Sequence, residues 1–218
     1  MIQTFYIDHM GSDLSVVNAA RVSFAKKSEW NPDWRDDHYE PLLPADSKLI
    51  KYLAKHKHMS PFGHAFASFH VKAPVFVARQ LVKHKFLRWN EISRRYVDHE
   101  PEFYQPTEWR GRSVDAKQGS EGVTYPDPDI INFYNHTALR SYNELLEHGV
   151  CPEQARMVLP QSMVTEWYWS GSLDAFADMC NLRCKPDTQY ETQVVAGHID
   201  TEMAKLFPVS WEALRENE

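Results

Sequence analysis

The sequence is poor in cysteine and contains no long apolar run. Its three cysteines, Cys151, Cys180 and Cys184, form no disulfide framework, and an odd number of thiols is typical of a reducing compartment. No segment reaches the ~20 apolar residues that a membrane span requires, and the N-terminus has no signal-peptide pattern. We therefore expect a cytoplasmic protein with no membrane partner.

The chain also has fewer basic than acidic residues: 24 Lys and Arg and 30 Asp and Glu give a formal net charge of −6. A general nucleic-acid binder normally carries a basic surface, so no nucleic-acid partner is expected. Neither G-x-G-x-x-G nor G-x-x-x-x-G-K-[ST] occurs. Cys180 and Cys184 are four residues apart, but no further His or Cys pair has metal-ligand spacing, so no metal site is predicted.

The sequence does contain enough for one mixed domain, since 218 residues with 43% apolar content suit a single core over residues 1–218. Short β-prone runs predict strands at 2–7, 65–72 and 163–169. Apolar periodicity predicts helices capped by Asp13 and by Asp46, one beginning at Pro74 and ending at 83–85, and others at 129–148, 152–158, 174–182 and 189–207. The order is not a regular βαβα alternation. The expected class is α/β of the α+β type, rich in helix around a small sheet.

Two stretches between these elements are predicted to be loops. Residues 26–45 hold prolines and many charges, which favours a surface loop. Residues 105–128 combine Pro, Gly, Ser and Asp, and such long excursions often act as lids over functional sites. The aromatic cluster Trp167-Tyr168-Trp169 favours core packing over ligand contact.

Residues 79–96 differ from the rest of the chain, because six cationic side chains, one histidine and one carboxylate occur together directly after an apolar helix. A run of charge is normally a solvated face. Here Trp, Asn, Ser and Tyr are interleaved with the cations, and they offer directional hydrogen bonds and stacking. A phosphate joined to a planar heterocycle would use every one of these side-chain types.

The segment resembles the signature R-H-R-x-x-S-x-N-E-x-S-x-R-Y of flavin-dependent thymidylate synthases. In this chain it reads Lys83-His84-Lys85-x-x-Arg88-x-Asn90-Glu91-x-Ser93-x-Arg95-Tyr96. Other stretches resemble the family in the same order, at 10–15, 19–24, 58–64, 69–80, 102–104, 155–160 and 181–191. The resemblance implies methylation of deoxyuridylate (dUMP) at uracil carbon 5, with methylenetetrahydrofolate and NADPH as co-substrates and FAD as cofactor. It also implies a homotetramer whose active sites form between subunits.

Site residues follow from the same resemblance, position by position. The residues expected to bind dUMP are Gln80, Lys83, Glu91, Ser93, Arg95, Arg156 and Arg183. Those expected to bind FAD are Ser23, His58, Ser60, Lys83, His84, Lys85, Asn90, Asp178 and Gln189.

Three of these residues are expected to act in the reaction. Arg183 would stabilise the charge that develops on the uracil ring. His84 would serve in proton transfer, because histidine titrates near neutrality. Ser93 would position the nucleotide, since no base that could activate it as a nucleophile is evident.

Several positions depart from the family pattern. The arginines of R-H-R are lysines, which keep the charge but lose the planar bidentate fork. The other departures are Gly63, Arg88, Ser172, Asp178 and Asp187. A divergent synthase, for example a viral one, is the first interpretation. A paralogue modifying another pyrimidine nucleotide or delivering a hydroxymethyl group, a form with weak FAD binding, a non-catalytic pyrimidine-nucleotide-binding protein and an RNA-binding module are the alternatives.

Overall fold

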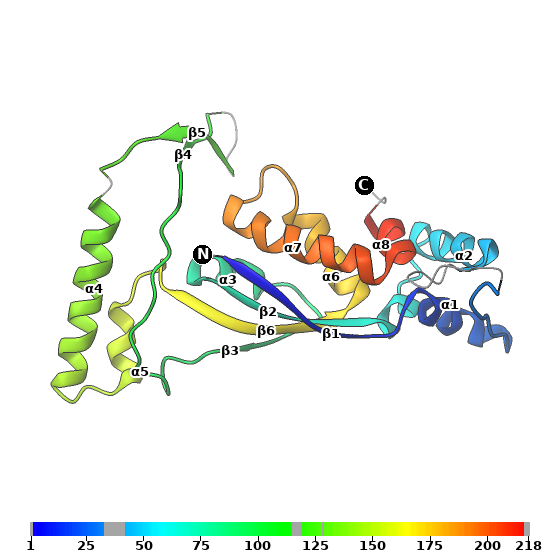
Figure 1. The fold of residues 1–218 in the computed structure, drawn as a ribbon, viewed down its shortest axis with the longest axis horizontal. Coiled ribbons are helices and arrows are strands. Elements are labelled where there is room, and N and C mark those ends of the chain that lie inside the picture. Colours follow the sequence, from blue (N-terminus) through cyan, green and yellow to red (C-terminus); the bar gives the residue numbers. More distant parts are fainter. Residues whose placement is uncertain (1, 33–41, 115–118, 128, 216–218) are drawn as a thin grey trace.

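The computed structural model describes residues 2–32, 42–114, 119–127 and 129–215. Its main sheet has four antiparallel strands in the order β1-β2-β6-β3. The strands are β1 (Gln3–Met10), β2 (Phe66–Pro74), β3 (Leu87–Glu91) and β6 (Val164–Ser172). The three predicted strands are confirmed, each extending further than expected, and β3 lies inside the basic segment (Figure 1).

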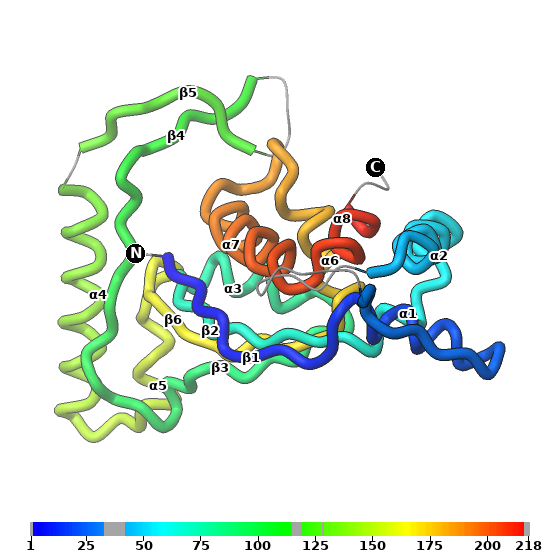
Figure 2. Tube along the Cα trace, turned by 45° about the vertical axis from the view of Figure 1, so that its right-hand side comes forward, coloured from blue at the N-terminus to red at the C-terminus, as the bar shows by residue number. Residues whose placement is uncertain are grey.

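The sheet has one buried face and one open face, as the alternation of side chains in a strand requires. Phe69 and Val71 of β2 are buried on one face together with Trp167 and Trp169 of β6, which confirms that these tryptophans are core residues. Tyr168, between them, is 50% exposed. In both views the helices α6 and α7 lie on one side of the sheet (Figures 1 and 2).

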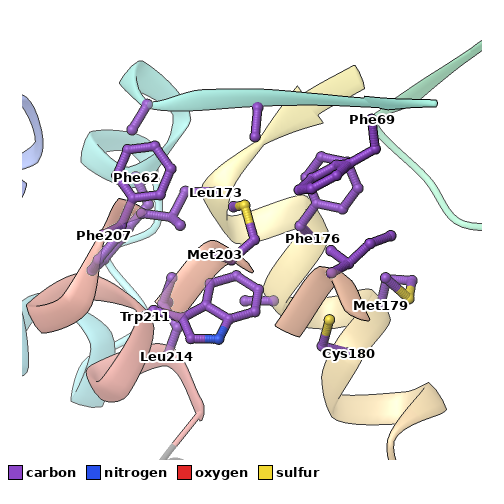
Figure 3. Close-up of a cluster of buried hydrophobic side chains, with 14 of the residues drawn as sticks. Phe62, Phe69, Leu173, Phe176, Met179, Cys180, Met203, Phe207, Trp211 and Leu214 are labelled. Carbon is purple, nitrogen blue, oxygen red and sulfur yellow. The ribbon is translucent and has the colours of Figure 1, made fainter. Parts of the chain in front are cut away.

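The helices confirm most of the predicted ones. They are α1 (Asp13–Arg21), α2 (Pro44–Lys55), α3 (Val75–Leu81), α4 (Asp129–Glu147), α5 (Pro152–Ala155), α6 (Leu173–Arg183), α7 (Tyr190–Leu206) and α8 (Pro208–Arg215). Three 3₁₀ turns occur at Val22–Phe24, Ser60–His64 and Arg156–Val158. The core forms where α6, α7 and α8 pack under β2, with Phe176, Met203 and Trp211 at its centre (Figure 3). The mixed, helix-rich fold is therefore confirmed.

The two predicted helix caps are wrong. Ser12 is the N-cap of α1, and the carboxylate of Asp13 instead accepts the backbone N–H groups of Val209 and Ser210 in the first turn of α8, at 3.0 and 2.8 Å. Asp46 lies in the first turn of α2 and is buried against Arg21, whose Nε donates to it at 2.9 Å. For both carboxylates the donors come from a distant segment and not from the helix in which the carboxylate lies.

Three other predictions are corrected. Pro74 is the N-cap of α3, and that helix ends at Leu81, before the Lys83–Lys85 stretch. The expected loop at 105–128 contains a hairpin of β4 (Trp109–Arg112) and β5 (Ser120–Thr124), with 115–118 and 128 outside the described residues. The expected loop at 26–45 ends where α2 begins at Pro44, and its residues 33–41 also lie outside the described part.

None of the helices in the described part of the chain is both long and apolar enough to cross a bilayer. The described residues also contain no group of three or more His, Cys, Asp or Glu side chains arranged to hold a metal ion.

Candidate active site

The ends of three helices meet at the first cluster of predicted site residues. Gln80 lies near the end of α3, Arg183 is the last residue of α6, and Gln189 precedes the first residue of α7. The Gln80 amide donates to Oε1 of Gln189, and Arg183 Nη2 donates to the backbone oxygen of Gln80 at 3.5 Å. The structure thus brings together two expected nucleotide-binding residues and one expected flavin-binding residue.

His84 belongs to the same cluster. Its Nε2 accepts a hydrogen bond from Nε of Arg183 at 3.0 Å, which requires an unprotonated nitrogen at that position. Burial, together with the nearby positive charge of Arg183, lowers the pKa of His84 to about 4. The expectation that His84 titrates near neutrality is therefore wrong. The neutral ring orients Arg183, and because Nε2 accepts that hydrogen bond, the single ring proton is on Nδ1.

A buried carboxylate anchors the cluster on its other side. Glu191, in the first turn of α7, is 3% exposed and receives Nη2 of Arg110 at 2.6 and 2.7 Å to its two oxygens. Burial raises the pKa of Glu191, but the hydrogen bonds and charge of Arg110 outweigh it and hold that pKa below its usual value. The hydroxyl of Tyr104 also donates to Glu191, at 3.4 Å. Burial, with Glu191 close by, raises the pKa of Tyr104 to about 12.

Arg110 and the anchoring role of Glu191 are absent from the set that the sequence predicts. Glu191 appears there only as a matching position, and Arg110 lies in the stretch taken for a loop. The one available signal was an arginine beside Trp109 in a stretch of mixed charge, which is too weak to assign a partner 81 residues away.

A pocket of about 500 Å³ opens beside this carboxylate. Aromatic side chains line one part of it, and Arg110, Gln189 and Glu191 line another. Pockets of this size and mixed lining are typical of small-molecule sites. The β4–β5 hairpin contributes to its wall, so the predicted lid stretch does border a cavity.

A second pocket, of about 780 Å³, lies between α1, α2 and the turn at Ser60–His64. Three expected flavin-binding residues, Ser23, His58 and Ser60, line it. Lys26 lines it as well, and Tyr52 and Phe24 provide aromatic surface. The structure thus brings these three predicted residues together, at a site separate from the Arg183 cluster.

The remaining nucleotide-binding candidates, apart from Lys83, lie at and after β3. Oε1 of Glu91 accepts the Thr165 hydroxyl at 2.7 Å, and Oε2 accepts the Trp89 indole N–H at 3.0 Å. Ser93 Oγ accepts the Arg95 backbone N–H at 3.3 Å, a contact that suits positioning. Figures 1 and 2 both draw the segment after β3 at the α5 end of the molecule, away from α6 and α7. These residues therefore do not join the Arg183 cluster within one chain.

The predicted site residues not yet described are also exposed. Asn90, Lys83 and Lys85 are exposed in and before β3, and Arg156 is exposed in the turn after α5 with its Nε on the Glu153 carbonyl at 3.2 Å. Asp178 is exposed on α6, where partial burial and Asp174 raise its pKa.

The comparisons with known proteins agree over nearly the whole chain. The family model Thy1, described as thymidylate synthase complementing protein, matches residues 6–209. A flavin-dependent thymidylate synthase of Thermus thermophilus is 37% identical over 213 residues, which cover 97% of this chain and 74% of that protein. One of Kosmotoga olearia is 38% identical, over 95% of this chain and 87% of that protein.

Two solved structures of a UMP/dUMP methylase, PolB from Streptomyces cacaoi, share the fold. The form bound with 5-Br dUMP has a TM-score of 0.79 and 32% identity, and covers 98% of this chain and 94% of that one. The form bound with 5-Br UMP has a TM-score of 0.81 and 30% identity, with coverage of 99% and 94%.

Proposed function

Because the chain belongs to the Thy1 family of thymidylate synthase complementing proteins, we propose that it is a flavin-dependent thymidylate synthase. The family resemblance of residues 79–96 is thereby confirmed. The reaction is the reductive methylation of dUMP at uracil carbon 5, with methylenetetrahydrofolate as carbon donor and NADPH as reductant. The observation that carries the proposal is the meeting of Gln80, His84 and Arg183 at one half-buried edge.

Arg183 is the residue on which the chemistry depends. Negative charge builds on the uracil carbonyl edge when carbon 5 attacks an electrophile, and a fixed guanidinium there stabilises the charge. Burial lowers the pKa of Arg183, yet arginine stays protonated at any working pH. His84 and the Gln80 carbonyl oxygen accept its N–H groups, so the cation is oriented before the nucleotide arrives.

The larger pocket has a volume and hydrogen-bond donors that suit FAD. Its volume of about 780 Å³ lies in the usual range for ligand sites, and Ser23, Ser60 and Lys26 can bind phosphate without a glycine-rich loop. His58 and Gln189 would hold other parts of the cofactor, with Lys83, His84, Lys85, Asn90 and Asp178. When bound, the flavin supplies the reducing equivalents that the methyl group needs.

The other half of the nucleotide site is proposed to come from a second subunit of a homotetramer. The segments that carry Glu91, Ser93, Arg95 and Arg156 are drawn away from the end of α6 that carries Arg183, and we infer that one nucleotide is bound by the two sets from different subunits. The sheet face that carries Tyr168 and Phe66 is open to a partner, with exposures of 50% and 40%. A closed symmetric assembly would join the two sets.

The free cysteines support a location in the reducing cytoplasm. Cys151 is exposed and Cys184 half-buried, and neither forms a disulfide.

The test is tritium release from dUMP labelled at carbon 5. Purified protein is incubated with labelled dUMP, FAD, NADPH and methylenetetrahydrofolate, and the mass of the nucleotide product is measured by mass spectrometry. Release with a product of thymidylate mass supports the proposal. A hydroxymethyl mass, or turnover of UMP in preference to dUMP, assigns the chain to a paralogous reaction instead. Nucleotide binding without release under any of these conditions leaves only a non-catalytic binding protein.

A further inference from the structure

The β4–β5 hairpin is tied to the body of the protein by Arg110. This side chain spans the hairpin, since its Nε donates to Ser120 Oγ of β5 at 2.9 Å while its Nη2 donates to Glu191 of α7. Its guanidinium also lies over the Tyr190 ring, 4.7 Å from the centroid. Both figures draw the hairpin beside the loop that joins α6 to α7 (Figures 1 and 2).

A close backbone approach fixes the same contact. Gly119 begins the β5 side of the hairpin with φ +84°, and a Cβ added there would lie 3.2 Å from the carbonyl oxygen of Asp187. Only glycine adopts this conformation readily at such a short distance. The hairpin is therefore seated on the 183–189 loop by backbone packing as well as by Arg110.

The bond to Glu191 determines how two amides are oriented. An ionised carboxylate only accepts, so Gln189 must turn its NH₂ toward Glu191, where Nε2 lies 3.3 Å from Oε2. Oε1 of Gln189 is then the atom that faces α3, and it accepts the NH₂ of Gln80. Oε1 of Gln80 in turn accepts the hydroxyl of the buried Thr192 at 3.2 Å.

Each member of this chain of hydrogen bonds thus has one permitted orientation, set by the charge of Glu191. That charge persists in a buried position because Arg110 pairs with it; a buried carboxylate without a partner is costly. One N–H and one lone pair of the Gln80 amide remain for a ligand, and both point in fixed directions.

We propose that Arg110 is a positioning residue for the nucleotide, acting through Glu191 and Gln189 to hold the Gln80 amide in its binding orientation. The inference rests on the proposed function, and it deepens it by giving the hairpin a part in substrate binding. The competing reading is that Arg110 only anchors the hairpin.

The test is a double-mutant cycle read by dUMP affinity. Arg110→Ala and Glu191→Gln each raise the Kd for dUMP by roughly tenfold or more, the usual effect of losing a charged hydrogen bond. Arg110→Lys keeps the ion pair and recovers part of the affinity. Arg112→Ala, an exposed arginine of the same strand, leaves the Kd unchanged and is the matched control.

Coupling decides between positioning and anchoring. In a Gln80→Met background, Arg110→Lys and Glu191→Gln have no further effect on the Kd if they act through Gln80. If the effects of these substitutions on the Kd add to that of Gln80→Met, and the wild-type protein turns over dUMP, the positioning role is overturned and the proposed function stands. A wild-type protein that binds no dUMP overturns both. Should Arg110→Ala fail to fold, Arg110→Lys and Glu191→Gln complete the cycle.

Discussion

The two sets of nucleotide-binding candidates differ in how completely they are formed within one chain. Gln80 and Arg183 belong to a connected hydrogen-bond network that runs through Gln189 to a buried carboxylate. Arg95 is exposed, and its guanidinium lies 4.9 Å from the centroid of the neighbouring Tyr96 ring and donates to the Tyr96 hydroxyl. The first set is oriented before any ligand binds, whereas in the second Glu91 is held by Thr165 and Trp89 but Arg95 is exposed to solvent.

This difference indicates which residues contribute to binding the nucleotide and which stabilise the transition state. A preorganised cation loses little on reaction because its orientation is already set. An exposed arginine must be ordered on binding, which costs about 0.5–1.5 kcal/mol of side-chain entropy. We infer that Arg183 contributes mainly to the rate, whereas Gln80 and the β3 set contribute mainly to binding the nucleotide.

The largest expected effect is the loss of Arg183. Arg183→Ala lowers kcat/KM for dUMP by about 10²–10³-fold, the range seen when one donor to a developing oxyanion is removed. Arg140→Ala, on the exposed face of α4, leaves kcat/KM unchanged and is the control. If kcat/KM fell only because KM rose, with kcat intact, the result would contradict the assignment of Arg183 to the transition state.

Mixed subunits test whether the two sets meet across an interface. Arg183→Ala and Arg95→Ala subunits, each poorly active alone, regain activity when co-expressed, because about one site in four by random pairing draws an intact set from each chain. Arg183→Ala combined with Gln80→Ala, two changes in the same set, shows no such recovery. Equal activity in both mixtures would mean that each nucleotide is held by one subunit.

The histidine beside Arg183 makes stability depend on pH. Between about pH 4 and its ordinary value of 6.5, the unfolded chain binds a proton at His84 that the folded chain does not, so the free energy of unfolding decreases as the pH falls through that window. Urea unfolding at about pH 7 and pH 5 measures the decrease in the free energy of unfolding between the two pH values. This decrease should be smaller in His84→Gln than in wild type. His136→Gln, exposed on α4, should retain the wild-type loss. A His84 variant with the full wild-type loss would exclude this residue as its source.

The sequence alone predicts those features that depend on local periodicity. Helices α1, α4, α6 and α7 follow from their apolar spacing, and β2 and β6 from alternation. It does not predict β3, whose Leu87-Arg88-Trp89-Asn90-Glu91 is mostly polar and becomes a strand only by pairing with β6 some 80 residues later. The hairpin buries too little surface to leave an apolar pattern. Helix α8 is missed because Pro208, which starts it, resembles the stop of α7.

The site shows the same division. Resemblance identified Gln80, His84 and Arg183 as separate positions, and their order in the chain could not show that the first two meet the third. The lowered pKa of His84 arises from burial and from a guanidinium 99 residues away, neither of which a single sequence displays. Asp13 illustrates the general cause: its acceptor role was evident, but its donors lie 196 and 197 residues further on.

The smallest expected effect concerns the lysines in the basic segment. Lys85 is exposed and stands where the family signature has an arginine, so Lys85→Arg restores a planar fork that can bind two oxygens at once. We expect the Kd for FAD to fall about two- to fivefold, a gain below that of one full charged hydrogen bond because the group is solvated. Fluorescence titration of apoprotein with FAD measures it, and Lys48→Arg on the exposed side of α2 is the control. If Lys85→Arg weakens FAD binding, the lysine is adapted to its own partner, and the β3 region is then as specifically built as the Arg183 network.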